Sequence, residues 1–386
     1  MRRPVLTERM RGFGTTVFAE MSALAVRTGA INLGQGFPDT DGPASLLEDA
    51  VAAIRAGANQ YPPGPGVPEL RRAVAAHQQR FYGLDVDPDD VLVTAGATEA
   101  VAAALLALCE RGDEVVVLEP YYDAYAAGIA LAGAERRTVP LRFPGFALDL
   151  DALRAAVTPR TRVLVVNSPH NPTGTVLTRA ELEAVAALAR ERDLLVLTDE
   201  VYEHLVFSGS EHVPLATLPG MAERTLTVSS AGKTFSVTGW KVGWVHGPRE
   251  LVAAVRTVKQ FLTYVGAAPF QPAVARALGR PDEDYAREAA DLEQRRDLLV
   301  AGLRAAGFAT SVPQGTYFVV ADAAPLGFED GYELCRRLPE LAGVVAVPLA
   351  PFHDDPALGR SLVRFCFCKR REVLEDAATR LARLGG

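Results

Sequence analysis

The sequence predicts an α/β protein in which a large, mostly parallel sheet is joined to a smaller α+β domain. Short β-branched strands alternate with helical segments from about residue 90 to residue 246, the pattern of a parallel sheet with helices on both faces. The alternation stops near residue 268, where a long helical segment and three more strand-like runs indicate a second unit. A chain of 386 residues is long enough for two cores.

The residues before the alternating region predict two helices separated by loops. Phe18, Met21 and Leu24 recur at helical spacing and predict a short helix. The segments "INLGQGFPDTDGP" and "YPPGPGVP" are rich in glycine and proline, which interrupt helices and central strands. A second helix is predicted from four residues that share one face: Leu70, Val74, His77 and Phe81.

The alternating region contributes six predicted strands, "DVLVTAG", "DEVVVLEP", "TRVLVVNSP", "DLLVLTDE", "RTLTVSS" and "KVGWVHG". Helices are predicted in "ATEAVAAALLALC" and "RAELEAVAALARER". A long helix from about Asp282 to Ala306 leads into the smaller domain, whose strands are predicted in "GTYFVVAD", "GVVAVPLAPF" and "SLVRFCFCK". There is no internal repeat.

Composition favours a cytoplasmic protein. The formal net charge of −7 is not that of a protein that binds nucleic acid or anionic membranes. No apolar run approaches the ~18 residues of a membrane helix, and the basic N-terminus lacks the apolar segment of a signal peptide. The four cysteines form no CxxC pair, so we expect neither a disulfide framework nor a metal site.

Polar residues follow the predicted strands, and ligands of parallel sheets gather at the carboxyl ends of strands. After "VLVTA", Gly96 allows a tight turn, and the free amides of Ala97 and Thr98 would face an anion at the start of a helix. The alternative is an ordinary strand-to-helix turn. After "VLVVNSP", Asn171 lies between two prolines and is either a fixed donor to a ligand or part of an Asx turn.

Two charged residues follow the next strands. Asp199 ends an apolar run, so its carboxylate needs a cationic partner or serves as a helix cap. Lys233 stands in "AGKT", where a partly desolvated amine could act as a nucleophile. A phosphate-binding P-loop would require glycine six residues before this lysine, and that position is Thr227, so the P-loop is excluded.

The C-terminal strand "LVRFCFCK" contains an arginine among apolar residues. Arg364 is a candidate carboxylate binder, with an exposed charge on an edge strand as the alternative. Cys366 and Cys368 share its face and are expected to be small core residues rather than metal ligands. His204, one helical turn from Asp199 and Glu200, is expected to be structural, with a metal ligand as the alternative.

Four motifs then resemble a known family. "NSPHNPTG", "TDEVYEHL", "SSAGKTFSVTGWKVGW" and "VRFCFCK" are similar to those of class I pyridoxal-phosphate aminotransferases of fold type I, and the resemblance covers nearly the whole chain. It implies an N-terminal arm and part of the small domain at 1–40, a large cofactor-binding domain at 41–280 and a small C-terminal domain at 281–386. The nearest subgroup contains kynurenine, glutamine and methionine aminotransferases. "NLGQGFPDTDGP", "NQYPPGPGVPELRRA" and "KQFLTYVGAAPFQPAVA" most resemble actinobacterial N-succinyldiaminopimelate aminotransferases.

The resemblance implies pyridoxal 5′-phosphate as the cofactor and assigns roles around its ring. Lys233 matches the lysine that binds the cofactor aldehyde covalently and moves the substrate proton. Asp199 matches the carboxylate that keeps the pyridine nitrogen protonated. Asn171 and Tyr202 match the donors to the phenolic oxygen, and Tyr122 matches the aromatic ring that stacks on the pyridine.

The same resemblance assigns phosphate contacts to Ala97, Thr98 and Ser230, and to Lys241, where the family often has arginine. Tyr61 matches a tyrosine that reaches the phosphate of the partner subunit, which implies a homodimer with shared active sites.

For the substrate α-carboxylate, Arg364 matches the binding arginine, with Asn171 beside it and Gly36 as a backbone contact. The implied reaction is a ping-pong transfer between an amino acid, with glutamate as the expected donor, and a 2-oxo acid. The expected substrate is N-succinyl-L,L-diaminopimelate of lysine biosynthesis. Kynurenine, glutamine or methionine transamination, and carbon–sulfur lyase activity on cystathionine or cysteine conjugates, are the alternatives within the family.

Two alternatives from other classes fit the sequence less well. An NAD-dependent dehydrogenase would carry GxGxxG after its first strand, and "GATEAV" lacks those glycines. An aminotransferase-like module of a transcription regulator would be accompanied by a basic DNA-binding domain, whereas this chain is acidic and begins with the aminotransferase-like arm.

Overall fold

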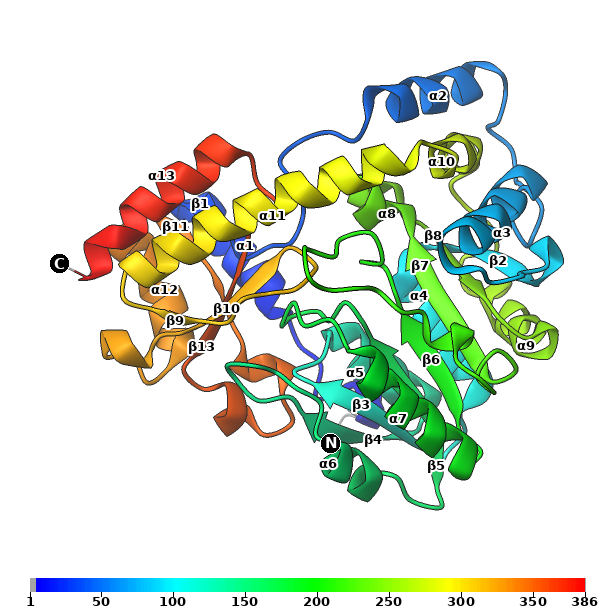
Figure 1. Ribbon diagram of the computed structural model, residues 1–386, viewed down its shortest axis with the longest axis horizontal. Coiled ribbons are helices and arrows are strands. Elements are labelled where there is room, and N and C mark those ends of the chain that lie inside the picture. Colours follow the sequence, from blue (N-terminus) through cyan, green and yellow to red (C-terminus); the bar gives the residue numbers. More distant parts are fainter. Residues whose placement is uncertain (1–4, 386) are drawn as a thin grey trace.

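A seven-stranded sheet forms the centre of the larger part of the molecule (Figure 1). The computed structural model describes residues 5–385. The strand order is β2-β8-β7-β6-β5-β3-β4, and β8 is antiparallel to both of its neighbours. The strands are β2 (Val91–Ala95), β3 (Glu114–Glu119), β4 (Glu135–Pro140), β5 (Thr161–Asn167), β6 (Leu195–Asp199), β7 (Thr225–Ser230) and β8 (Val242–His246). The prediction of a mostly parallel sheet is confirmed.

Helices cover both faces of this sheet because its strands are apolar on both sides. In β3, Val115 and Val117 pack with α4 (Gly96–Leu108), α5 (Asp123–Ala132) and α9 (Arg249–Lys259), whereas Val116 and Leu118 pack in the core that includes α6 (Leu150–Ala156) and α7 (Arg179–Glu191). A third cluster joins β2 and β8 to α2 (Ala44–Arg55), α3 (Pro68–Tyr82) and α10 (Phe270–Leu278). The two-sided burial explains the nearly continuous apolar runs of the strands.

The smaller part combines segments from both ends of the chain. Strands β9 (Ala309–Thr310), β10 (Phe318–Asp322), β12 (Val347–Pro348) and β13 (Leu362–Cys366) form an antiparallel sheet in the order β12-β13-β10-β9. A separate parallel pair joins β1 (Ile31–Asn32) to β11 (Val344–Val345). The associated helices are α1 (Val17–Thr28), α11 (Asp282–Ala305), α12 (Gly331–Ala342) and α13 (Arg371–Leu381). The expected domain boundaries near residues 40 and 280 stay a prediction.

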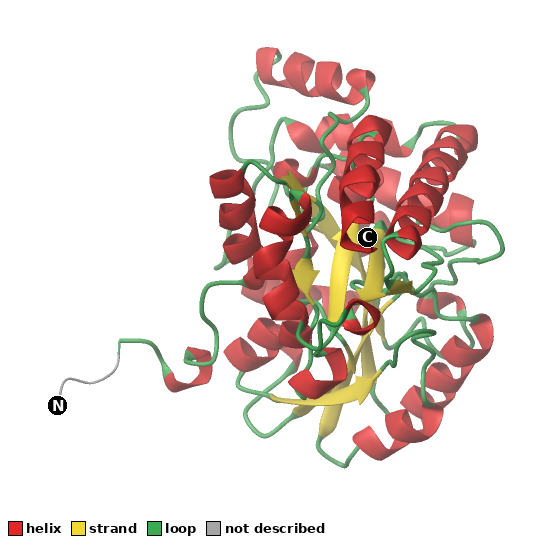
Figure 2. Cartoon of the chain, turned by 90° about the vertical axis from the view of Figure 1, so that its left-hand side faces the viewer, coloured by secondary structure: helices red, strands yellow, loops and turns green. Residues whose placement is uncertain are grey.

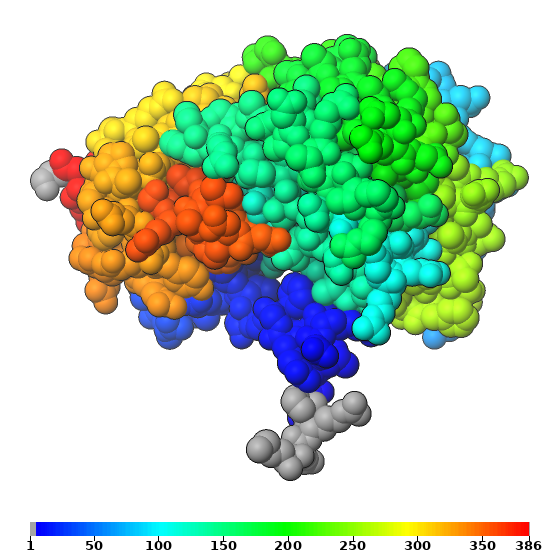
Figure 3. Space-filling model, turned by 90° about the horizontal axis from the view of Figure 1, so that it is seen from below, coloured from blue at the N-terminus to red at the C-terminus, as the bar shows by residue number. Residues whose placement is uncertain are grey.

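Helix α11 runs along the length of the molecule and connects the region of α10 to the smaller part (Figure 1). The segment before α1, including the single turn Glu8–Met10, projects sideways from the body, and none of the residues of that turn is buried (Figures 2 and 3). Within residues 5–385, no helix is both long and apolar enough to cross a membrane.

Several elements differ from those predicted. The run "GVVAVPLAPF" is not one strand, because β11 and β12 belong to different sheets. The elements for which the sequence patterns gave no prediction include α2, α5, α6, α9, α10, α12, α13, β1, β4 and β9. The long helix predicted from about Asp282 to Ala306 is confirmed as α11, Asp282–Ala305.

Candidate active site

A cavity of about 260 Å³ lies where the carboxyl ends of the large sheet meet the smaller part. All the residues assigned from the sequence to cofactor or substrate binding line it except Tyr61, namely Gly36, Ala97, Thr98, Tyr122, Asn171, Asp199, Tyr202, Ser230, Lys233, Lys241 and Arg364. These residues come from segments more than 300 positions apart. Their convergence shows that the strand-end residues of the sequence share one site.

The start of α4 forms one end of the cavity and is suited to bind an anion. Gly96 has a φ of 74°, and a Cβ there would lie 3.0 Å from Lys241 Nζ. The residue before the helix gives it no side-chain cap, so its first amides are available to a ligand, with the positive end of the helix dipole behind them. Ser230 and Lys241 line the same cavity. Helix amides, a hydroxyl and an ammonium group together fit a phosphate.

Asp199 places a carboxylate deep in the same cavity. It ends β6 opposite Asn167 of β5 and is 5% exposed. Tyr125 donates a hydrogen bond of 2.6 Å to its Oδ2 atom. Burial raises the pKa of Asp199, against the effect of the Tyr125 hydrogen bond, because desolvation disfavours the charged form. A protonated ring nitrogen in the cavity would supply the cation that this carboxylate needs.

Lys233 lies just after β7, in the short helix α8 (Ala231–Thr234). Its Nζ atom donates to Tyr317 Oη at 2.9 Å, and Tyr317 Oη donates to the Gly36 carbonyl oxygen at 2.9 Å. Burial lowers the pKa of Lys233 to about 8, against the opposing influence of nearby Asp199. The amine is therefore held in one orientation and is deprotonated more readily than a surface lysine.

Arg364 is an interior residue, so the alternative of an exposed edge-strand charge is wrong. Strand β13 lies between β12 and β10, and Arg364 is 1% exposed. Its guanidinium donates to Asn171 Oδ1 at 3.0 Å and to the Gly34 carbonyl oxygen at 2.9 Å. Its Nε atom is buried without a partner. The Phe318 ring lies 4.0 Å from the guanidinium carbon.

Asn171 is held by two neighbours rather than by an Asx turn. Its side-chain oxygen accepts from Arg364, and its backbone amide donates to Asn167 Oδ1 at 2.7 Å. The Asn171 side-chain nitrogen remains available as a donor to a ligand.

Several residues of the site were not predicted from the sequence. Asn167 ends β5 and could have been found by the strand-end rule that found Asp199. Tyr125 lies one helical turn after Tyr122. Tyr317 precedes β10 and shows no local signal, because its role depends on contacts with residues 84 and 281 positions away.

Tyr61 is the one predicted residue that lies outside the cavity. Its side chain is 81% exposed and packs edge-on against Tyr264, with ring centroids 5.6 Å apart. Cys366 and Cys368 are buried, as expected. His204 lies in a separate group of side chains, described below.

Comparisons with known proteins identify the family of the chain. The family model described as aminotransferase class I and II matches residues 28–381. The chain is 57% identical to the probable N-succinyldiaminopimelate aminotransferase of Mycobacterium tuberculosis over 97% of both chains. It is 42% identical to methionine aminotransferase of Escherichia coli over 96% of both chains.

Solved structures show the same fold. The N-succinyldiaminopimelate aminotransferase of Mycobacterium tuberculosis superposes with a TM-score of 0.96, at 57% identity, over 98% of this chain and 100% of that chain. Aspartate aminotransferase from Thermus thermophilus superposes with a TM-score of 0.90, at 36% identity, over 99% of this chain and 100% of that chain. The chain has the fold type I architecture and belongs to the class I and II aminotransferases, enzymes that transfer amino groups between amino and oxo acids.

Proposed function

We propose that this aminotransferase uses pyridoxal 5′-phosphate, held in the cavity that contains Lys233. The observation that carries the proposal is one cavity with an amine of lowered pKa, a buried carboxylate and an uncapped helix N-terminus. These three groups fit the aldehyde, the ring nitrogen and the phosphate of that cofactor. When bound, it supplies an electron sink for the carbanion formed at the substrate Cα.

Residues of this chain would hold the cofactor from several sides. Asp199 would accept a hydrogen bond from the ring nitrogen, and its own position is fixed by Tyr125. Asn171 and Tyr202 would donate to the phenolic oxygen, and Tyr122 would cover one face of the ring. The phosphate contacts would come from Ala97, Thr98, Ser230 and Lys241.

Substrate binding and proton transfer are assigned to other side chains. Arg364 would bind the α-carboxylate through the edge of its guanidinium that carries Nε, which has no partner in the structure. Asn171 and the backbone at Gly36 would contact the same carboxylate. Lys233 Nζ would take the proton from the substrate Cα. Tyr317 Oη, 2.9 Å from this amine, would keep it directed at the reacting carbon.

A homodimer follows from the same proposal, because Tyr61 is assigned to the phosphate of a partner subunit. Its large exposed ring packs against Tyr264 (50% exposed), and Phe261 (83% exposed) precedes Tyr264 by three residues. Exposed aromatic side chains of this kind are often covered at protein interfaces. The projecting N-terminal segment, in which Val5 is fully exposed, is a second candidate contact. We also keep the prediction of a cytoplasmic location, with all four cysteines free.

For the substrate pair, we propose N-succinyl-L,L-diaminopimelate, formed when its 2-oxo counterpart accepts the amino group of glutamate. The support is the 57% identity, over almost the full length, to the probable enzyme of that name. Methionine or kynurenine transamination is the second candidate, because methionine aminotransferase of Escherichia coli is 42% identical and kynurenine–oxoglutarate transaminase 3 of Mus musculus is 36% identical.

A panel of amino donors tests these proposals. Glutamate, glutamine, methionine, kynurenine and the succinylated substrate should each be assayed with matched oxo-acid acceptors. We expect the highest kcat/KM for the succinylated substrate and parallel double-reciprocal lines, as a ping-pong mechanism requires. A higher kcat/KM for methionine or kynurenine would replace the substrate proposal, and intersecting lines would contradict the mechanism. Pyruvate released from cystathionine without an oxo-acid acceptor would instead indicate lyase activity.

A further inference from the structure

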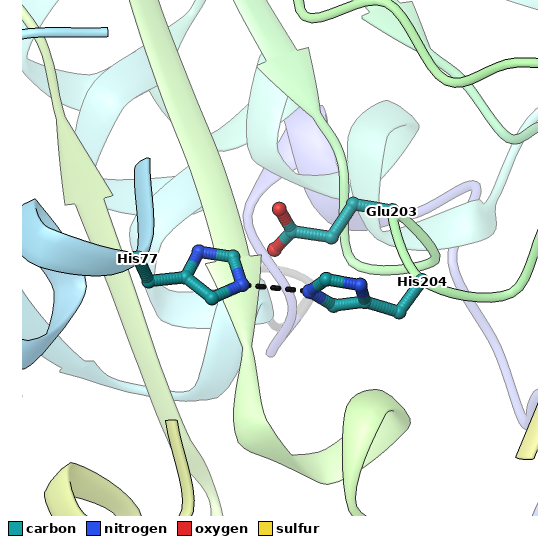
Figure 4. A group of neighbouring side chains, drawn as sticks. All are labelled: His77, Glu203 and His204. Carbon is teal, nitrogen blue, oxygen red and sulfur yellow. Dashed lines mark hydrogen bonds between the residues drawn. The ribbon is translucent and has the colours of Figure 1, made fainter. Parts of the chain in front are cut away.

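A second group of polar side chains lies outside the cavity described above. His77 comes from α3, and Glu203 and His204 come from the turn after β6. Helix α3 and this turn are more than 120 positions apart in the sequence. Their side chains point toward one another across a small gap (Figure 4).

The three side chains offer one ligand atom each within a small volume. The candidate atoms lie within 4.8 Å of one another, and the two imidazole Nε2 atoms are 2.6 Å apart. His77 is 2% and Glu203 5% exposed, whereas His204 is partly exposed. The three side chains are therefore largely shielded from solvent, and His204 is the most exposed of them.

Glu203 has a buried oxygen without a hydrogen-bond partner in the described chain, although the Tyr82 hydroxyl lies near its carboxylate. Its Oε1 atom accepts a hydrogen bond of 2.5 Å from Ser229 Oγ, but Oε2 has no partner. Buried carboxylate oxygens are normally paired with a donor or a cation. The contact between His77 and His204 satisfies those two rings with each other and leaves this oxygen unpaired.

Aromatic and amide side chains surround the two imidazole rings. Phe81 packs against both imidazoles, with centroid distances of 4.7 Å to His77 and 4.7 Å to His204, and Tyr285 lies 4.3 Å from His204. The Gln78 side-chain nitrogen lies 3.4 Å from His77 Nδ1, and the buried Gln78 side-chain oxygen has no partner. A metal-binding histidine donates its second ring N–H to an acceptor, so metal binding through His77 Nε2 requires the Gln78 amide to turn its oxygen toward Nδ1.

We propose that His77, Glu203 and His204 form a binding site for a divalent transition-metal ion of the zinc class. Two imidazole nitrogens and one carboxylate oxygen form a ligand set that Zn²⁺ accepts, with a fourth position for water on the open side. In tetrahedral coordination two nitrogens lie roughly 3.3 Å apart, so the rings must separate by less than 1 Å. His204 can make this movement because it is in a short turn and partly exposed.

Such an ion would tie α3 to the turn that carries Tyr202 into the main cavity. It would lie apart from the substrate and act as a structural clamp. The competing occupant of the gap is a proton shared by the two imidazoles, which would satisfy the rings without an ion. Metal binding by the purified protein distinguishes the two.

The test uses tag-free holoenzyme, because the chain has only six histidines and a tag would add others. The protein is stripped with a chelator, equilibrated with Zn²⁺ and analysed for metal per chain, with thermal unfolding in parallel. We expect one ion per chain, a rise in Tm with Zn²⁺, and an affinity at least about tenfold lower in His77→Gln and Glu203→Gln. His353→Gln, a buried histidine of the smaller part, is the matched control and should bind as the wild type does.

Three results would overturn the proposal. The first is less than a tenth of a Zn²⁺ ion per chain in the wild type, which would mean that a proton shared by the two imidazoles occupies the gap. Another is equal Zn²⁺ affinity in wild type and His77→Gln. The third is loss of binding in Cys366→Ser with binding retained in His77→Gln, which would place the ion at the buried cysteines. Circular dichroism and cofactor absorbance identify any variant that fails to fold.

Discussion

At the scale of single residues, the environment of Lys233 separates it from the other amines of the chain. The sequence has only four lysines, Lys233, Lys241, Lys259 and Lys369. Burial lowers the pKa of Lys233 to about 8, and of the four it alone donates to a tyrosine hydroxyl within the cavity. Lys241 lines the same cavity near the start of α4. Substitution of the two lysines should therefore affect different properties of the enzyme.

Replacing Lys233 by alanine should abolish transamination, because both the covalent attachment and the proton transfer are lost. We expect a fall in kcat of at least about 10²–10⁴-fold with an unchanged circular dichroism spectrum. Lys241→Ala should mainly increase the dissociation constant of pyridoxal phosphate, measured by titration of the apoenzyme. Equal loss of kcat in both variants at saturating cofactor would contradict these separate roles.

Tyr317→Phe tests the hydrogen bond that orients the amine. Removing one hydrogen bond to a charged or reacting group costs about 1.5–3 kcal/mol, so we expect kcat to fall about tenfold or more while KM for the amino donor changes little. The pH profile of kcat should also shift, since the amine loses its hydrogen-bond partner. An unchanged kcat and an unchanged pH profile would show that the Tyr317 hydroxyl has no role in orienting the amine.

At the scale of elements, the site depends on a close approach between the start of α4 and strand β8. A Cβ on Gly243 would lie 2.6 Å from the Gly96 carbonyl carbon and 2.8 Å from the Ala97 amide nitrogen. Backbone atoms cannot move aside as a flexible side chain can, so any side chain at Gly243 would displace the anion-binding turn.

Gly243→Ala should therefore weaken cofactor binding and lower the Tm. Overpacking of this kind costs about 1–3 kcal/mol. Gly239→Ala, four residues earlier, is the matched control because nothing lies within 4 Å of its added Cβ. Thermal unfolding and cofactor titration of both variants check the prediction, and it is wrong if the two behave alike.

Strand ends are also where sequence reasoning worked best. Asp199, Lys233 and the turn at Gly96 were found because ligands collect at the carboxyl ends of parallel strands, and all three line the cavity. The antiparallel direction of β8 was not predictable, because a buried apolar strand has the same pattern in either direction. Tyr317 could not be found from local pattern, since its partners come from distant segments.

At the scale of the whole molecule, the cavity is shared between the two parts of the chain. Lys233 and Asp199 come from the large sheet, and Arg364 and Phe318 come from the smaller antiparallel sheet. Tyr61 is exposed and outside the cavity, although the family resemblance assigns it to a phosphate. A partner subunit would reconcile these two facts, and its contribution can be measured.

Mixed dimers test whether Tyr61 acts across subunits. Tyr61→Ala and Lys233→Ala should each be inactive or weak as pure proteins, the first because phosphate binding is impaired at limiting cofactor. If the two are unfolded and refolded together, half of the dimers are mixed and carry one intact site, so activity should recover to about a quarter of the wild type. No recovery above the sum of the parents would contradict a shared active site.

The central claim is that Lys233 is the amine that binds pyridoxal phosphate in this aminotransferase. The most direct test is reduction of the cofactor-loaded protein with borohydride, followed by digestion and mass spectrometry. With four lysines in the chain, each candidate peptide can be resolved. The account predicts that the phosphopyridoxyl mass is attached to Lys233, at close to one per chain. Attachment to Lys241, Lys259 or Lys369 instead, or no attachment at all, would contradict it.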